Sequence, residues 1–399
     1  METSIFAFAT DLADEGLGPV LDNVQRRGGL DGLTVAAAYH EGRDVFPHNP
    51  VRKVRFLESG AVFFQLDPAR WREVRLQPPV SEVADILPEL VGAAERRGLV
   101  VRAWTVFLHN GALAAAHPDC APENAFGDRY ITDLCPANPD VRAFARALAA
   151  DVARLGIASI CAESLHYHPL EHGYAHERYF VPLGLAARCL LGFCFCPHCV
   201  DAARGRGVDA EAVRSFARAE LERIFAGGTE DAAEELDPDW LGTLAGGELA
   251  GYLRAREETV ASLVAEVAET ARAHGASFEF IDPSGAVKGY ATGRPTGAPA
   301  PSIAWQLGVD VAAVARACDG IEAIGYAAEP ERLRHDLAAY GEAAVSVALR
   351  PTPPDCESAD NLRAKVELAR ELGLRRVDFY HYGLMRLDAL DWIRAALTP

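Results

Sequence analysis

A close group of cysteines is the most specific chemical signal in the chain: Cys194, Cys196 and Cys199 stand in the segment FCFCPHC. Thiolates at C-x-C-x-x-C spacing can share one tetrahedral metal ion, and a closed site with four protein ligands is typical of structural zinc. Several side chains elsewhere could supply the fourth ligand: Cys120, Cys135, Cys189 or His198. We take Cys120 as the fourth ligand. The alternatives are a redox pair and a set of buried free thiols.

A single carboxylate interrupts the apolar segment ASICAESLHY, at Glu163. A carboxylate in such a segment is either desolvated, which raises its pKa, or paired with an arginine or a backbone amide. A glutamic acid with a raised pKa at the end of a barrel strand can serve as the general acid of a glycosidase. We therefore expect Glu163 to be a catalytic residue.

Glycosidases of the common type use a second carboxylate, and its distance from the first sets the outcome. A separation of about 5–5.5 Å leads to retention and one of about 6.5–9.5 Å to inversion. Asp282 in FEFIDPSG is our candidate, because it ends a predicted strand before a Pro-Ser-Gly turn. Its alternative role is to cap that turn through an Asx hydrogen bond. Glu329 is a weaker candidate, since it can simply favour the start of a helix.

Polar side chains follow several predicted strands, and as a set they suggest recognition of a polyhydroxylated molecule. We expect these residues to bind substrate hydroxyls: His40, His109, Asn110, His166, Tyr167, Tyr326 and His381. Any one of them can instead satisfy the hydrogen bonds of a loop. The further histidines His168, His172 and His176 leave open a catalytic metal site that would include Glu163.

Short β-rich runs alternate with longer helical runs, and this alternation predicts the elements that position these residues. The eight β runs are residues 4–10, 33–40, 99–109, 157–167, 277–282, 320–327, 343–351 and 375–383. They are nearly continuous apolar runs, as expected of parallel strands covered on both faces. We predict a single (β/α)8 TIM barrel, an α/β fold, over residues 1–399, with the active site at the carboxyl ends of the strands. A doubly wound open sheet is the alternative.

The longest stretch between predicted strands separates the fourth from the fifth. We expect an insertion there, over residues 166–250, that carries the cysteine segment. A smaller addition follows the second strand, where residues 51–66 look like a β-hairpin that turns at Ser59 and Gly60.

Composition and charge exclude several classes of function. The chain has 39 Lys and Arg against 57 Asp and Glu, a net charge of −18, so nucleic acid and membrane partners are not expected. No apolar run reaches the roughly 18 residues of a membrane span and no signal peptide is recognisable, so we expect a cytoplasmic location. No GxGxxG, phosphate-loop or GxSxG motif is present, which disfavours dinucleotide, nucleotide triphosphate and α/β-hydrolase functions. Assembly into a homo-oligomer stays open.

Several segments occur together in an order that resembles a group of uncharacterised bacterial (β/α)8 glycoside hydrolases: AYHEGRDVFPHNP, AWTVFLHNG, LCPANPDVRAF, CAESLHYHPLEHGYAHERY and LGFCFCPHC. The cysteine segment is similar to the zinc cluster of the family 42 β-galactosidases. The resemblance covers most of residues 1–225. It implies a barrel related to the clan of those galactosidases, a structural zinc, and an acid/base glutamate after strand four, where Glu163 lies.

The chain departs from the pattern of that clan at two positions. The acid/base glutamate of the clan usually follows an asparagine, whereas Ala162 precedes Glu163 here. The nucleophile of the clan is a glutamate that ends strand seven, whereas this seventh strand ends in ALRPTP and the next carboxylate is Asp355. An inverting scheme based on Asp282, or a function other than hydrolysis, therefore stays open.

Together these features predict a carbohydrate-active enzyme similar to a glycoside hydrolase, which acts on a small glycoside through Glu163 and Asp282. Two other functions remain. One is a metal-dependent sugar isomerase, epimerase or aldolase that binds its metal through Glu163 and histidines. The other is a barrel that binds a sugar without turning it over.

Overall fold

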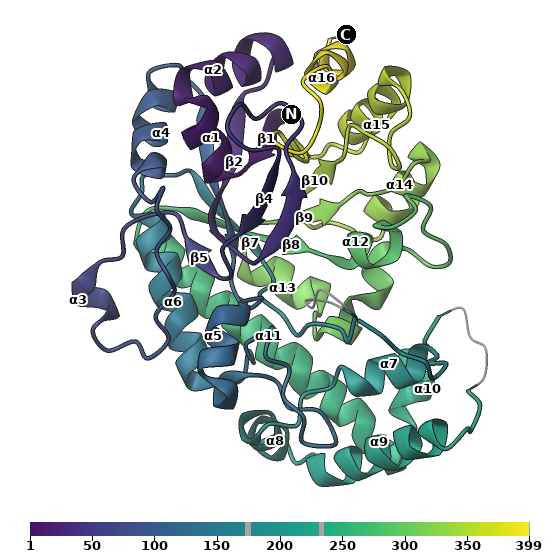
Figure 1. Ribbon diagram of the computed structural model, residues 1–399. Helices are drawn as coiled ribbons and strands as arrows, with labels where there is room; N and C mark the ends of the chain where they lie inside the picture. The colour runs from purple at the N-terminus through teal and green to yellow at the C-terminus, as the bar shows by residue number, and fades with distance from the viewer. Residues whose placement is uncertain (172–176, 231–234, 399) are drawn as a thin grey trace.

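Eight parallel strands form a closed barrel in the computed structural model, which describes residues 1–171, 177–230 and 235–398 (Figure 1). The strands are β1 (Glu2–Ala7), β2 (Gly32–Tyr39), β6 (Val100–Val106), β7 (Ser159–Glu163), β8 (Ser277–Asp282), β9 (Gly320–Ile324), β10 (Val345–Leu349) and β11 (Arg376–Phe379). They pair in the order β1-β11-β10-β9-β8-β7-β6-β2, and β2 pairs with β1 to close the ring. The predicted (β/α)8 barrel is confirmed, and the open sheet is excluded.

Helices cover the outside of the barrel. They are α1 (Ala9–Glu15), α2 (Leu17–Asp22), α4 (Ile86–Glu95), α6 (Pro139–Ala153), α11 (Glu248–Ala273), α13 (Val311–Ala317), α14 (Pro330–Ala338), α15 (Ala359–Glu371) and α16 (Ala389–Leu397). Local sequence determines where some of them begin: the Asn138 side chain accepts hydrogen bonds from the first N–H groups of α6, and Ser358 does so for α15. In the described parts of the chain, no helix combines the length and apolar character needed to cross a membrane.

A buried ion network fills the barrel near the amino ends of the strands. Arg376 Nη2 lies 2.6 Å from Glu279 Oε2 and 3.4 Å from Glu322 Oε2, and Arg376 Nε pairs with Asp378. All four residues are buried. Buried charges are tolerated only when they are paired and hydrogen-bonded, so these ion pairs are part of the structural core. Active sites of such barrels lie at the opposite end, at the carboxyl ends of the strands.

The chain between β7 and β8 forms the predicted insertion, a helical layer beside the barrel at the bottom of Figure 1. It contains α7 (Leu185–Leu191), α8 (Pro197–Arg204), α9 (Ala210–Phe225) and α10 (Pro238–Gly242), packed around a buried cluster that includes Leu190 and Leu221. The 26-residue helix α11 connects the two parts, since Tyr252 lies in this cluster while Val260 and Leu263 lie in the barrel core.

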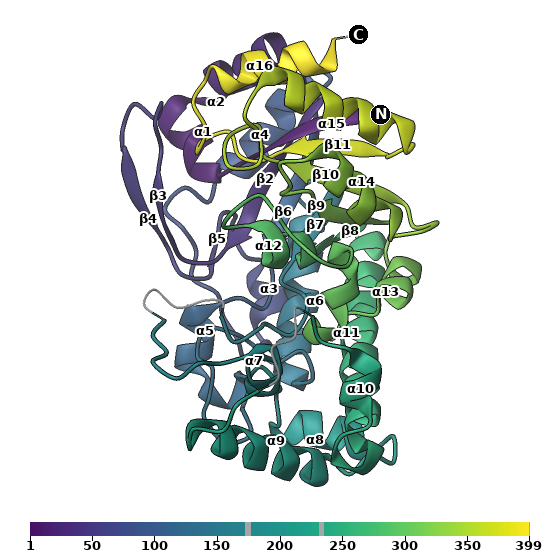
Figure 2. The same cartoon turned by 90° about the vertical axis from the view of Figure 1, so that its right-hand side faces the viewer.

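The segment after β2 differs from the hairpin predicted there. Strand β4 (Val54–Leu57) pairs antiparallel with the preceding strand β3 (Gly42–Val45), and β5 (Ala61–Val62) pairs antiparallel with β2. The strands on either side of Ser59 and Gly60 therefore do not pair with each other, and these two residues do not turn a hairpin. The intervening residues 46–53 close the β3–β4 hairpin through Asn49, whose side-chain oxygen accepts hydrogen bonds from the N–H groups of residues 51 and 52. This hairpin stands out at the left of Figure 2.

Candidate active site

Glu163 ends β7 and points into the barrel. Its direction follows from the alternation of side chains along a strand, because Cys161, two residues earlier, lies beside Glu279 and Arg376 in the barrel interior. Glu163 Oε2 accepts a hydrogen bond of 2.5 Å from Trp104 Nε1. Burial raises the pKa of Glu163 to about 7, against the opposing effect of that hydrogen bond. Near neutral pH this carboxyl is thus roughly half protonated, as a general acid requires.

Aromatic side chains gather around Glu163, and we call this set the aromatic cup: Phe6, Phe8, Tyr39, Trp104, Tyr326 and Tyr380. The Trp104 ring centroid lies 4.6 Å from that of Tyr39 and 5.8 Å from that of Tyr380. Burial raises the pKa of Tyr39, Tyr326 and Tyr380, and the charge of Glu163 adds to each rise. These tyrosines therefore stay neutral and can donate hydrogen bonds from their hydroxyls.

His381 adds a buried donor to the aromatic cup. Its ring centroid lies 4.2 Å from that of Phe8, and its Nδ1 accepts a hydrogen bond of 3.1 Å from the N–H of Gly383. Burial lowers the pKa of His381 to about 3, so the ring is neutral and its proton is on Nε2. Nε2 has no hydrogen-bond partner among the described residues. A buried donor of this kind suits a substrate hydroxyl.

Histidines from three strand ends form a row on the rim of the barrel. The rings of His40 and His109 are stacked with centroids 4.3 Å apart, and His168 lies 5.4 Å from His109 and 4.9 Å from His166. His168 Nδ1 also lies 3.1 Å from Asp133 Oδ1. The structure therefore brings together the predicted residues His40, His109 and His166.

The catalytic metal site that would use these histidines finds no support in the described residues. There, groups of three or more possible ligands lie close together only at four cysteines and at Cys161, Glu279 and Glu322, and neither group includes Glu163 or a histidine. The other two histidines of the sequence pattern, His172 and His176, lie outside the described residues.

Two of the residues expected to bind hydroxyls have other partners. Asn110 Oδ1 accepts a hydrogen bond of 3.0 Å from Leu113 N and so caps α5 (Gly111–Ala116). Tyr167 is 3% exposed, and its hydroxyl lies 3.2 Å from Cys199 Sγ. The reason is that β7 ends at Glu163, four residues before the end of the predicted run, so Tyr167 already belongs to the chain that enters the insertion.

Asp282 ends β8 as predicted, but it faces out of the barrel, so it does not form a pair with Glu163. Glu279 faces the interior, and a residue three positions later on a strand faces the opposite side. Asp282 Oδ1 accepts hydrogen bonds from the N–H and the hydroxyl of Ser284, and Oδ2 accepts one of 2.6 Å from the Tyr340 hydroxyl. It therefore takes the turn-capping role. The weaker candidate, Glu329, is exposed and pairs with Arg294.

The sequence analysis missed Asp44, which lies on β3 and is half-buried. Burial raises the pKa of Asp44, and no described residue makes a hydrogen bond or ion pair with its carboxylate. Its charge contributes to the raised pKa of both Tyr39 and Tyr380, so Asp44 lies near the aromatic cup. A lone aspartate in a short polar segment carries no sequence signal; only the fold of the hairpin reveals it.

The four-cysteine cluster consists of Cys135, Cys194, Cys196 and Cys199, which lie at the junction of the β6–α6 loop and the insertion. Cys135 Sγ lies 3.5 Å from Cys196 Sγ, 3.4 Å from Cys199 Sγ and 3.8 Å from Cys194 Sγ. Four thiolates around one zinc ion at about 2.3 Å stand about 3.8 Å apart, so these distances fit. The N–H of Glu123 also donates to Cys194 Sγ, at 3.4 Å. Contacts of this kind orient metal ligands.

Cys120, our predicted fourth ligand, is not part of this cluster. A backbone hydrogen bond from Cys135 N to the carbonyl of Cys120 sets the two residues side by side. Cys135 turns its thiol into the cluster, whereas the thiol of Cys120 lies 3.8 Å from Arg75 Nη1. Cys135 was one of the alternatives that the spacing left open.

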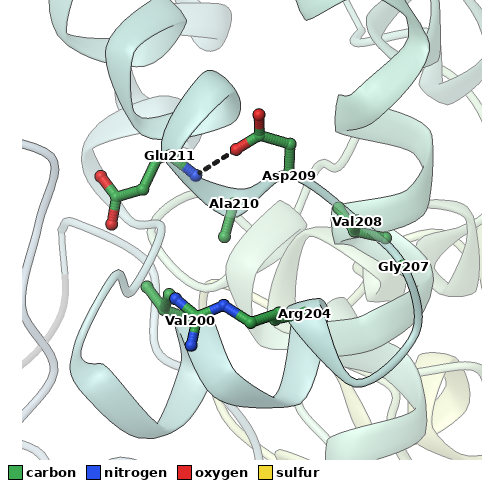
Figure 3. Close-up of a pocket in the computed structure, with 7 residues that line it drawn as sticks. All are labelled: Val200, Arg204, Gly207, Val208, Asp209, Ala210 and Glu211. Carbon is green, nitrogen blue, oxygen red and sulfur yellow. Dashed lines mark hydrogen bonds between the residues drawn. The ribbon is translucent and has the colours of Figure 1, made fainter.

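Two hollows lie away from Glu163. One, of about 340 Å³, lies in the insertion between α8 and α9 (Figure 3). Its polar groups have ordinary structural partners, since Asp209 caps α9 by accepting hydrogen bonds from the N–H groups of Glu211 and Ala212. The other, of about 250 Å³, is lined in part by Asp133 and Pro169, beside the rim histidines.

Comparisons with known proteins point to the fold alone. No protein-family model matches this chain, and no curated protein matches it in sequence. Solved structures do match: a β-galactosidase from the psychrophilic Marinomonas ef1 has a TM-score of 0.56 at 12% identity, over 100% of this chain and 58% of that chain. An α-L-fucosidase isoenzyme 2 from Paenibacillus thiaminolyticus has a TM-score of 0.53 at 12% identity, over 99% and 49%.

The catalytic domain of a β-amylase from Paenibacillus polymyxa is similar over nearly its whole length. Its TM-score is 0.53 at 11% identity, and the match covers 98% of this chain and 94% of that domain. This chain spans only about half of the galactosidase and fucosidase chains. These matches show that the chain shares the (β/α)8 barrel fold of these enzymes, while activity and substrate have to be argued from the site.

Proposed function

We propose that this barrel hydrolyses a small glycoside, with Glu163 as the general acid that protonates the leaving oxygen. The observation that carries this proposal is a carboxyl with a pKa of about 7, raised by burial, at the end of the fourth barrel strand and within an aromatic cup. A protonated carboxyl held in an apolar surrounding is what departure of an alkoxide requires. The similarity of fold makes glycoside hydrolysis more plausible, but the proposal rests on the site and not on the fold.

The surrounding side chains suit a sugar. The rings of Trp104 and Tyr39 give an apolar wall, and the neutral hydroxyls of Tyr326 and Tyr380 offer hydrogen bonds. His381 presents a buried Nε2 donor. We propose that these groups hold the sugar ring while Glu163 Oε1 faces the glycosidic oxygen, since Oε2 is held by Trp104.

The pKa of Glu163 also bears on the stereochemistry. A second carboxylate within about 5–5.5 Å would raise that pKa further through like-charge repulsion. Burial is the cause of the rise and no neighbouring carboxylate is among its causes, which supports a scheme without a close carboxylate pair. We therefore propose inversion, with a more distant carboxylate as the base that activates water. Asp44 is the described carboxylate whose charge reaches the same tyrosines as Glu163.

We also propose that the four-cysteine cluster binds one structural zinc ion. The four thiols are buried, unbridged by disulfides and spaced as tetrahedral ligands would be. A zinc ion there would fix the insertion to the loop after β6. It takes no part in the chemistry at Glu163.

The test is hydrolysis of a panel of nitrophenyl glycosides that differ in sugar and anomeric configuration. Glu163→Gln should lower kcat by about 10²–10⁴-fold on the best substrate, because an amide cannot give up a proton. Glu329→Gln, an exposed carboxylate in a surface ion pair, is the matched control and should leave kcat unchanged.

Product analysis by NMR should show inversion at the anomeric carbon. No turnover of any glycoside, together with sugar binding that Glu163→Gln leaves intact, would favour the sugar-binding barrel instead. A Glu163→Gln enzyme as fast as the wild type would remove Glu163 from the mechanism.

A further inference from the structure

A buried arginine without a carboxylate partner lies next to the four-cysteine cluster. Arg256 is on α11 and is 2% exposed. Its guanidinium lies between the rings of Tyr167 and Phe193, 4.6 Å from each centroid. Nη2 donates to the carbonyl of Gln306 at 3.1 Å, whereas Nε and Nη1 have no hydrogen-bond partner among the described residues.

This arrangement leaves a positive charge to be balanced. Arginine stays protonated in proteins, and a buried charge without compensation costs several kcal/mol. No carboxylate in the described chain lies within ion-pair distance of Arg256. Glu257, the next residue, is partly exposed; its charge attracts that of Arg256, but the two groups form no ion pair within 4 Å. Burial raises the pKa of the nearby Cys189 thiol to about 12, so that thiol is neutral.

Two tyrosines connect the cluster to the surroundings of Arg256. Tyr167 stacks on the guanidinium with its ring and places its hydroxyl 3.2 Å from Cys199 Sγ. Tyr252, one helical turn before Arg256 on α11, donates a hydrogen bond from its hydroxyl to the carbonyl of Cys194. The arginine is thus packed against the shell of groups that surrounds the thiols.

We propose that Arg256 is the counter-charge of a metal–tetrathiolate cluster. One divalent zinc ion with four thiolates carries a net charge of −2, and the buried guanidinium offsets half of it. Each charge then balances the other: the metal–thiolate cluster would compensate a buried arginine that no ion pair neutralises, and the arginine would stabilise the negative charge of that cluster in an apolar surrounding. Arg256 is in this sense a positioning and charge-balancing residue that does not bind the metal itself.

The experiment measures metal binding and does not depend on enzymatic activity. Zinc content of the full-length wild-type protein comes first, by elemental analysis, with one ion per chain expected. Zinc affinity is then measured by competition with a chromophoric chelator at fixed pH and ionic strength. Arg256→Gln should bind zinc about 10–100-fold more weakly, the usual size of an outer-shell effect. Arg256→Lys, which keeps the charge, should recover most of that loss.

Arg272→Gln is the matched control, because Arg272 lies on the same helix and pairs with Asp319 at the surface. It should bind zinc as the wild type does. The visible spectrum of the cobalt-loaded proteins shows whether the tetrahedral thiolate site is intact in each variant, which separates weakened affinity from a lost site.

Four outcomes would overturn the inference. Equal zinc affinity in Arg256→Gln and the wild type would show that the charge is irrelevant. Equal loss in Arg256→Lys and Arg256→Gln would assign the arginine to packing. If Arg256→Gln does not fold, Arg256→Lys alone decides. Its zinc affinity is then expected to lie within about threefold of the wild-type value, and a loss of more than about tenfold would contradict the inference. A wild-type protein that takes up neither zinc nor cobalt would overturn the zinc proposal itself, on which this inference rests.

Discussion

At the scale of the residue, the acidity of Glu163 depends on two opposing effects. Burial favours the neutral carboxyl, and the indole N–H of Trp104 favours the carboxylate by donating a hydrogen bond to it. The two together give a pKa of about 7. A general acid must be protonated to act, so the rate should fall as the pH rises through that value.

Replacing Trp104 by phenylalanine should raise the pKa of Glu163 above about 7, because the ring is kept and only the donor is lost. The alkaline limb of the profile of kcat/KM against pH should then move to higher pH. Carboxyl-detected ¹³C NMR measures the same pKa without a substrate. Trp392→Phe, the same change on α16, is the control. A limb that stays or moves to lower pH would show that the indole does not set this acidity.

At the scale of the element, the β3–β4 hairpin carries Asp44 and is attached to α1. The hairpin is attached to α1 by an ion pair of 3.0 Å between Arg55 and Asp14 and by a hydrogen bond of 3.0 Å from Asn49 to Asp14. His48 Nδ1 lies 2.9 Å from Glu15 Oε1 in the same contact. These contacts hold β3 in place and with it Asp44.

If Asp44 activates water, Asp44→Asn should lower kcat by about 10²-fold or more while KM changes little, because an amide cannot accept the proton. Glu58→Gln, an exposed change just beyond β4, should leave both parameters unchanged. Steady-state kinetics on the best glycoside make the comparison. Full activity in Asp44→Asn would assign the base to another residue and leave the role of Glu163 intact.

Helix α11 is the other element that matters for function. Its carboxyl-terminal half covers the barrel, and its amino-terminal half packs in the insertion with Tyr252 and Arg256 beside the cysteine cluster. One long helix thus sets where the insertion lies relative to the barrel wall. The zinc ion proposed at the four cysteines would then fix the insertion to the loop that follows β6.

At the scale of the whole molecule, the barrel has two different ends. The amino end is filled by Arg376 and its carboxylates, and the carboxyl end is lined by aromatic rings and Glu163. Burial and the charge of Asp378 raise the pKa of Glu322, while the charge of Arg376 holds the pKa of Glu279 below its usual value despite burial.

Arg376→Met should lower the free energy of unfolding by about 3–5 kcal/mol, because it leaves buried carboxylates without their cation. Glu322→Gln is the matched control and should stay close to wild type at neutral pH, since the amide mimics the protonated acid. Urea unfolding measures both. The folded-state pKa of Glu322 is raised, so its contribution is lost as the pH rises through that pKa, and Glu322→Gln should lose less stability at alkaline pH. Equal stability of Arg376→Met and wild type would contradict the assignment.

Much of the architecture follows from local pattern. The alternation of apolar runs and helical runs predicts eight strands, and β8 has the predicted bounds, Ser277–Asp282. The insertion between the fourth and fifth strands follows from the length of chain between them. The pairing of the short strands does not follow in this way: β4 pairs with β3 across the turn that Asn49 closes, and β5 pairs with β2, which lies more than 20 residues earlier in the chain.

The candidate site likewise has features that local sequence predicts and features that only tertiary contacts determine. Residue type and position at a strand end were enough to single out Glu163, three cysteines and His381, since apolar context and short-range spacing are written in the sequence. Only the tertiary structure turned Asp282 outward, supplied Cys135 from 61 residues before Cys196, and brought Trp104 to Glu163 across 59 residues. Strand register and loop packing bring these distant residues into contact. Both depend on the free energy of the whole barrel, which no local segment encodes.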